Sequence, residues 1–229
     1  MGNCACESSA PASTLVVHRG APTATEWLGK PARSTAASDV GADGGSARGT
    51  WVLHIGDSFV DASFSQNIEP RIRASGAKYV VDSRTSTYTT TWAYDAQLDT
   101  WLSRRPTLVI VTLGANEVDI PAPEVHAGAV ERIARRIRQA GASCVWTTPP
   151  LWRGDTGVVR VIHDHCAPCA FFDSDAALDG GLVASERQPD RIHPNSRGGR
   201  RWAEAFSEWL DEHRDVSRPG WWVLPFERR

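Results

Sequence analysis

The sequence lacks any long hydrophobic run. No window of the 229 residues approaches 18 consecutive apolar residues, so we expect no helix of this chain to span a bilayer. The N-terminus also lacks the apolar core of a secretory signal peptide. Two interpretations of the compartment follow: a cytoplasmic protein, or the mature part of an exported protein whose leader is absent. The cysteine pattern described below favours the second, an extracytoplasmic location.

An excess of charge of either sign is missing as well. The chain has 25 basic and 27 acidic residues, which gives a nucleic-acid partner no electrostatic support. Lysine is nearly absent, since only Lys30 and Lys78 occur, and we draw no function from that bias. The hydrophobic share of 41% and the chain length predict one ordinary globular domain, with or without a tail.

The first segment, residues 1–48, has few residues that could enter a core. It is rich in Ala, Ser, Thr, Pro and Gly, and we interpret it as an irregular leader or tether with a short strand near Val16. Cys4 and Cys6 raise the hypothesis of a lipid anchor at the N-terminus, although Asn3 before Cys4 fits a lipoprotein processing site poorly.

From residue 49 onward, strand-like and helix-like patterns alternate. Short, β-branched apolar runs indicate buried parallel strands at 51–55, 79–81, 108–113 and 144–148. Helical patterns lie between them, so we predict a domain over 49–214 built on a parallel sheet covered on both faces.

Two helices have clear apolar faces. In the first, within 121–142, Val125, Ala129, Ile133 and Ile137 recur every four positions, and Gly141 is placed to end the helix. The second follows the segment "HPNSRGG" and has an apolar stripe that consists of Trp202, Ala205, Phe206, Trp209 and Leu210.

Tryptophan is abundant, with ten residues. Trp92, Trp146 and Trp152 fall after strand ends or on loops, where an indole can support a sugar ring or an acyl chain, but core packing is the favoured role for each. In the C-terminal tail, residues 215–229, we expect Trp221 and Trp222 to pack the tail onto the domain.

A candidate nucleophile stands directly after the first strand. Ser58 ends the motif "GDS" at the carboxyl edge of the predicted sheet, where sites gather in open α/β folds. A serine needs a base and a third group that holds the base. Among seven histidines, His193 is the best candidate because Asp190 lies three residues earlier in a turn-rich loop. His54 is expected to be packed within a strand.

The other histidines are interpreted as surface residues or as possible zinc ligands. His126 and His213 are expected on helix surfaces. His163 and His165 belong to the segment "HDHCAPC", which groups zinc-ligating residue types without a second well-spaced pair.

The five cysteines leave at least one thiol unpaired within the chain. Cys166 and Cys169 have a spacing that closes a small disulfide ring, and Cys144 is an alternative partner. We favour a disulfide or buried thiols over zinc.

Three ordered motifs, "GDS" (56–58), "GAN" (114–116) and "DRIHP" (190–194), resemble those of the SGNH (GDSL-type) hydrolases. The resemblance covers about residues 50–212 and implies a flavodoxin-like three-layer α/β/α sandwich. It further implies Ser58 as nucleophile, His193 as general base, Asp190 as its orienting carboxylate, and the backbone N–H of Ser58 with the Asn116 side chain as oxyanion-hole donors. No metal or organic cofactor is expected.

The second motif of that family is altered here. The alignment puts Thr87 where the family has a glycine whose N–H also points into the oxyanion hole. A β-branched residue resists positive φ, so we expect a differently shaped loop, or Ser86 in that role. Glu117, after Asn116, is expected to hold its loop rather than react.

The substrate implied is a small-molecule or carbohydrate ester with a short acyl group, with an O-acetylated sugar as one candidate, because no large apolar lid is visible. Two alternatives stay open: an O-acyltransferase that uses the same residues, and a catalytically silent glycan-binding module with the same fold.

Overall fold

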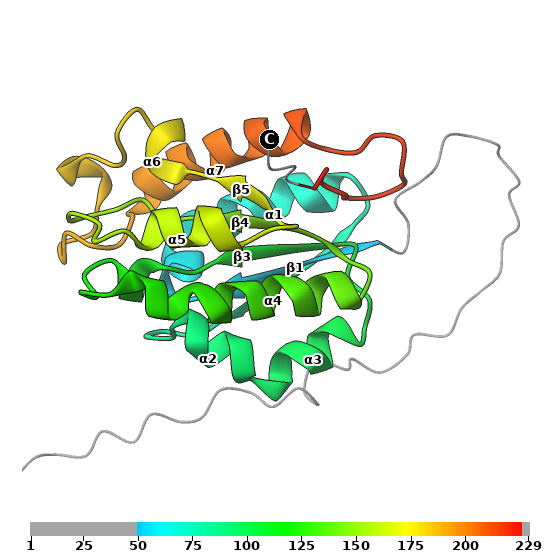
Figure 1. The fold of residues 1–229 in the computed structure, drawn as a ribbon. Coiled ribbons are helices and arrows are strands. Elements are labelled where there is room, and N and C mark those ends of the chain that lie inside the picture. The colour runs from blue at the N-terminus through cyan, green and yellow to red at the C-terminus, as the bar shows by residue number, and fades with distance from the viewer. Residues whose placement is uncertain (1–49, 226–229) are drawn as a thin grey trace, which may run out of the picture. The chain divides into compact units, whose positions relative to one another are not determined.

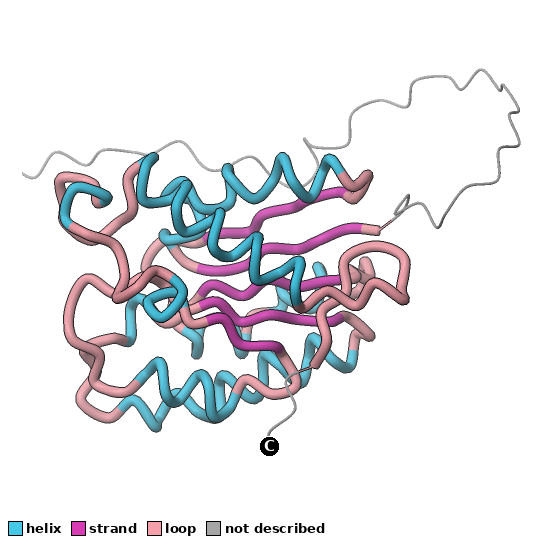
Figure 2. Tube along the Cα trace, turned by 90° about the horizontal axis from the view of Figure 1, so that it is seen from above, coloured by secondary structure: helices cyan, strands magenta, loops and turns pink. Residues whose placement is uncertain are grey.

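The computed structural model describes residues 50–225. The five strands form one parallel sheet in the order β2-β1-β3-β4-β5 (Figures 1 and 2), and they are β1 (Trp51–Gly56), β2 (Lys78–Ser83), β3 (Leu108–Thr112), β4 (Ser143–Thr147) and β5 (Ala170–Phe172). The four expected strands are present. The fifth, β5, was not expected, because its run is only three residues long and the apolar pattern around it is weak.

Helices cover both faces of the sheet (Figure 1). One face carries α1 (Ser65–Ala74), α6 (Ser174–Ala177) and α7 (Ser196–Glu212), and the other carries α2 (Thr89–Tyr94), α3 (Ala96–Leu102), α4 (Ala127–Gln139) and α5 (Val158–His165). Alternate residues of each strand therefore enter different cores: Val52 packs with α1 and α7, while Leu53 packs with α2 and α4. The fold is a three-layer α/β/α sandwich, as predicted.

The short helical turns lie at loop ends. They are η1 (Val60–Phe64), η2 (Ala115–Glu117), η3 (Pro123–His126) and η4 (Ala184–Glu186). None of the helices in residues 50–225 is both long and apolar enough to cross a bilayer.

The helix predicted within 121–142 begins later than its pattern suggested. Residues 123–126 form the 3-10 turn η3, whose rotation differs from that of α4, so Val125 is exposed while Ala129, Ile133 and Ile137 are buried. The same turn buries His126, which corrects its expected place on a helix surface. Gly141 ends the helix with a φ of +79°, as predicted.

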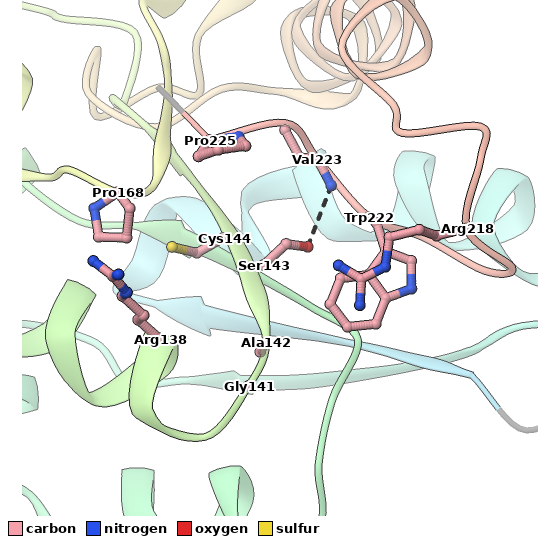
Figure 3. A pocket seen from close by; sticks show the side chains of 10 residues that line it. All are labelled: Arg138, Gly141, Ala142, Ser143, Cys144, Pro168, Arg218, Trp222, Val223 and Pro225. Carbon is pink, nitrogen blue, oxygen red and sulfur yellow. Dashed lines mark hydrogen bonds between the residues drawn. The ribbon is translucent and has the colours of Figure 1, made fainter. Parts of the chain in front are cut away.

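The C-terminal segment runs back along the domain as far as residue 225. Trp221 is buried and donates its indole N–H to Ser75 Oγ at 2.7 Å. Val223 donates its N–H to Ser143 Oγ at 3.3 Å, beside the start of β4 (Figure 3). The proposed leader and the N-terminal cysteines lie outside the described residues.

The disulfide joins Cys144 to Cys169, not Cys166 to Cys169 as the sequence favoured. The sheet register explains the pairing, because Val145 pairs with Ala170 and the residue before each is therefore a neighbour across the β4–β5 ladder. Cys166 is buried and stays outside the disulfide. Since Cys169 is bound to Cys144, it has no thiolate to offer the zinc site considered above.

Candidate active site

Ser58 stands at the carboxyl end of β1, where backbone packing is very close. A Cβ on Gly56 would lie 2.1 Å from Thr112 O of the neighbouring strand, so only glycine fits there. Asp57 is fully buried, and its Oδ1 accepts the N–H of Phe59 at 3.0 Å. This bond closes the turn that leads from the strand to Ser58.

A continuous hydrogen-bond chain joins Ser58, His193 and Asp190. Ser58 Oγ lies 2.8 Å from His193 Nε2, and His193 Nδ1 lies 2.7 Å from Asp190 Oδ2. With Nδ1–H donating to the carboxylate, Nε2 is left to accept the serine proton. The hydrogen bond to His193, helped by the N–H of Ile192, lowers the pKa of Asp190, so this carboxyl is ionised at neutral pH.

The loop that contains His193 is shaped by its own backbone. Asp190 Oδ1 accepts the N–H groups of Ile192 at 2.9 Å and His193 at 3.1 Å, and Arg191 takes a φ of +61°. Asn195 then caps α7 by accepting the N–H of Arg197. The sequence "DRIHPN" therefore encodes both the Asp–His pair and the helix start that fixes it.

Asn116 follows β3 on the same edge of the sheet. Its Nδ2 donates to Thr87 O at 2.8 Å and lies 3.5 Å from Asp57 Oδ2, so the amide is held between the loops after β1 and β2. The preceding Gly114 has a φ of +122°, which a side chain would strain. The structure thus places the Asn116 amide beside the Ser58 turn.

Thr87 lies in a loop whose unusual backbone angle falls one residue earlier. Ser86 takes the positive φ, +59°, and Thr87 does not, in agreement with the expected change of loop shape. The Thr87 N–H points to Arg84 O at 3.3 Å, and its hydroxyl donates to the same carbonyl at 2.8 Å. Thr87 Oγ1 also accepts the indole N–H of Trp92 at 3.0 Å.

Glu117 holds a loop, as expected. It is fully buried, its Oε1 accepts the N–H of Thr89 at 2.5 Å, and burial raises its pKa. Its Oε2 has no hydrogen-bond partner within residues 50–225. His126 Nδ1 binds Thr89 Oγ1 at 2.8 Å, so this trio joins the start of α2 to the Asn116 loop. Sequence reasoning missed Thr89 and His126, which no motif marks.

Aromatic rings form a wall beside His193. The ring of Phe59 lies between those of Trp152 and His193, with centroid distances of 5.3 Å and 5.1 Å. Trp152 is half-buried in the loop after β4, and its indole N–H has no acceptor in the described part of the chain. Trp92 and Trp146, by contrast, are fully buried core residues.

His54 is confirmed as a packed residue. It is fully buried, with Nδ1 2.5 Å from the Tyr79 hydroxyl and Nε2 2.8 Å from Thr112 Oγ1. Burial lowers its pKa to about 3, so the ring is neutral. His213 is half-buried at the end of α7, where it stacks on Trp209.

A pocket of about 430 Å³ lies elsewhere, between the start of β4 and the C-terminal segment (Figure 3). Arg138, Trp222 and the disulfide-bonded Cys144 are among the residues that line it. None of its lining residues belongs to the hydrogen-bond chain of Ser58, His193 and Asp190. The pocket lies at the amino end of β4, where Ser143 begins the strand, whereas Ser58 follows the carboxyl end of β1.

The fold of this chain is similar to those of several solved structures. No curated protein matches the chain. Among solved structures, TesA is similar with a TM-score of 0.61 at 22% identity, over 71% of this chain and 99% of that one. Axe2, an acetylxylan esterase from Geobacillus stearothermophilus, has a TM-score of 0.56 at 18% identity, over 72% and 95% of the two chains. A carbohydrate esterase family 3 protein from Talaromyces cellulolyticus has a TM-score of 0.55 at 16% identity, over 71% and 97%.

These likenesses show the fold. The family is shown by the model of the "GDSL-like Lipase/Acylhydrolase family", which matches residues 54–201, well over half of the chain. That span includes Ser58, Asn116, Asp190 and His193. The chain therefore belongs to the GDSL-like lipase/acylhydrolase family of carboxylic ester hydrolases.

Proposed function

We propose that this protein hydrolyses short acyl esters, O-acetyl groups on carbohydrates among them, through an acyl-enzyme on Ser58. The observation that carries the proposal is the unbroken hydrogen-bond chain from Ser58 Oγ through the His193 ring to Asp190. A serine is a weak nucleophile until a positioned base takes its proton. In this hydrogen-bond chain, His193 is the base and Asp190 fixes its orientation.

In the proposed reaction, Ser58 Oγ attacks the ester carbonyl as its proton passes to His193 Nε2. The tetrahedral oxyanion then collapses, and the protonated ring gives that proton to the leaving alcohol. A water molecule, deprotonated by the same nitrogen, attacks the acyl-enzyme. The second tetrahedral intermediate collapses, the ring returns the proton to Ser58 Oγ, and the acid is released. Asp190 stabilises the imidazolium during both halves.

Two donors are proposed for the oxyanion: the Ser58 N–H and the Asn116 Nδ2. The proximity of Asn116 to Asp57, which precedes the nucleophile, supports this role. Thr87 stays a proposed third donor. Its N–H would have to exchange the 3.3 Å contact with Arg84 O for the oxyanion.

Two observations support a carbohydrate ester as the substrate. The half-buried Trp152 stacks on Phe59, whose ring lies 5.1 Å from that of His193, and aromatic side chains suit sugar rings. Two similar structures are described as acetylxylan and carbohydrate esterases.

The test compares wild type with the Ser58→Ala and His193→Ala variants on p-nitrophenyl acetate and butyrate, with a fluorophosphonate probe for the nucleophile. We expect turnover and Ser58 labelling in wild type, faster cleavage of acetate, and a loss of about 10³-fold or more in each variant. Wild-type rates equal to those of the variants, without labelling, would refute the proposal.

Two further assays distinguish a hydrolase from an O-acyltransferase and from a glycan-binding module without activity. Acylated sugar formed in place of free acid, when a sugar acceptor is added, would identify an O-acyltransferase. Glycan binding that survives Ser58→Ala, without any turnover, would identify a silent binding module.

An extracytoplasmic location is also proposed, with the Cys144–Cys169 disulfide as its support, since disulfides persist mainly in oxidising compartments. Fractionation of the source cells, with lipid analysis of the native N-terminus, tests both the location and the lipid anchor.

A further inference from the structure

Arg187 is a buried arginine that makes no ion pair within residues 50–225. Its guanidinium donates only to backbone carbonyl groups: Ile192 O at 2.6 Å from Nη1, Leu151 O at 2.5 Å from Nη2, and Pro150 O at 3.4 Å from Nη1. Burial lowers the pKa of Arg187, against the opposing effect of nearby carboxylates. A charge removed from water in this way is a poor source of stability, which points to a geometric role.

The two terminal nitrogens of the guanidinium bridge two loops. Nη1 contacts Ile192 in the loop that contains His193 and, at 3.4 Å, Pro150 in the loop after β4, while Nη2 contacts Leu151 in that second loop, which also contains Trp152. The planar guanidinium fixes both contacts at once, which a lysine ammonium cannot do in the same way. Arg187 therefore sets the distance between the catalytic loop and the aromatic wall.

The contact with Ile192 O also leads directly to the catalytic carboxylate. The peptide unit between Ile192 and His193 accepts from Arg187 through its carbonyl and donates to Asp190 Oδ1 through the His193 N–H at 3.1 Å. A cation at one end of a peptide and a carboxylate at the other polarise the same hydrogen-bond chain, and each strengthens the other. Asp190 Oδ2 is the atom that holds His193 Nδ1.

We propose that Arg187 is a positioning residue of the active site, which orients Asp190, and through it the His193 ring, by way of the Ile192–His193 peptide. The proposal rests on the proposed function, because positioning matters only if Ser58 and His193 react.

The experiment compares Arg187→Ala and Arg187→Lys with the control Arg136→Ala. Arg136 is matched because it too is largely buried and donates to three backbone carbonyls, those of Trp92, Ala93 and Asp95. It differs in that it also pairs with Asp99, and α2, which holds two of its acceptors, lies on the opposite face of the sheet from α7. For each variant, kcat and KM on p-nitrophenyl acetate, the thermal midpoint, and the NMR signal of the His193 Nδ1 proton are measured.

We expect Arg187→Ala to lower kcat by about 10- to 100-fold with KM within about twofold of wild type, since small misplacements of catalytic groups cost rates of this order. The downfield His193 Nδ1 proton should broaden or disappear, and millimolar guanidinium ion should restore part of kcat. Arg187→Lys should lie between wild type and Arg187→Ala. Arg136→Ala should destabilise the protein and keep both kcat and the proton signal.

Equal losses in the Arg187 and Arg136 variants, in step with their thermal midpoints, would overturn the proposal and leave a structural role. So would an unchanged kcat and proton signal in Arg187→Ala. If wild type itself shows no turnover, the proposed function fails, and the His193 proton signal alone decides about Arg187. If Arg187→Ala does not fold, the same comparison is made with Arg187→Lys.

Discussion

Asp57 is the buried acid next to the proposed nucleophile, and its replacement by asparagine has a calculable effect. Asparagine keeps the Oδ1 that accepts the Phe59 N–H at 3.0 Å, so the turn can persist. What changes is the titration, because burial raises the pKa of Asp57 to about 7 and the nearby Glu117 carboxylate adds to the effect. The usual value, 3.8, applies in the unfolded chain.

Whether the free energy of unfolding rises or falls with pH depends on whether the folded or the unfolded protein holds the Asp57 proton. Between the two pKa values the folded protein holds a proton on Asp57 that the unfolded chain has lost, so the free energy of unfolding falls as pH rises and stops falling above pH 7. The full shift is worth about 4 kcal/mol, and about 2.5 kcal/mol of it falls between pH 5 and pH 8. His54 acts in the opposite sense, since its lowered pKa costs stability as pH falls below 6.5.

The two effects partly cancel in wild type, so the difference between wild type and Asp57→Asn is the quantity to measure. Urea denaturation at pH 5 and pH 8 should show wild type losing about 2.5 kcal/mol relative to the variant over that range. Asp119→Asn, at an exposed carboxylate paired with Arg153, is the control and should show no such pH dependence. A constant difference between wild type and Asp57→Asn at both pH values would refute the reasoning.

Three further predictions concern the disulfide and the oxyanion loop. Replacing both Cys144 and Cys169 by alanine opens a loop with a sequence separation of 25. The free energy of unfolding should fall by about 3.5 kcal/mol and the thermal midpoint by about 10 °C. A midpoint within about 2 °C of wild type would contradict this. Asn116→Ala should lower kcat on p-nitrophenyl acetate by about 10²- to 10³-fold, and an unchanged kcat would remove it from the oxyanion hole. Thr87→Val leaves the indole N–H of Trp92 without its acceptor and should cost about 1–3 kcal/mol in a urea titration, whereas Thr87→Ser should stay near wild type.

The fold was largely predictable because its strands after residue 50 are apolar and its loops carry the motifs. Ser58 and His193 could be paired from sequence since each follows or precedes a strongly patterned element. The hydrogen bond between them was not visible in the sequence, because it joins residues 135 positions apart whose distance depends on how α7 packs.

Several details depend on tertiary packing and escaped prediction. The sequence offered Cys144 only as the alternative partner, because its pairing with Cys169 follows from the β4–β5 register and β5 itself was too short to recognise. The burial of His126 follows from a 3-10 turn that breaks the helical period assumed from its neighbours. Arg187 has no motif at all, since its partners are carbonyl groups that any residue supplies.

The distance in sequence between Ser58 and His193 makes the site a reporter of folding. Ser58 follows the first strand, which pairs with β2 and β3 inside the sheet, and His193 lies just before the last helix. A chain still emerging from the ribosome can thus complete all five strands without the Ser58–His193 hydrogen bond, and gains that bond only when α7 docks. Timed labelling of Ser58 by a fluorophosphonate would then measure the moment at which the whole domain closes, before any substrate is known.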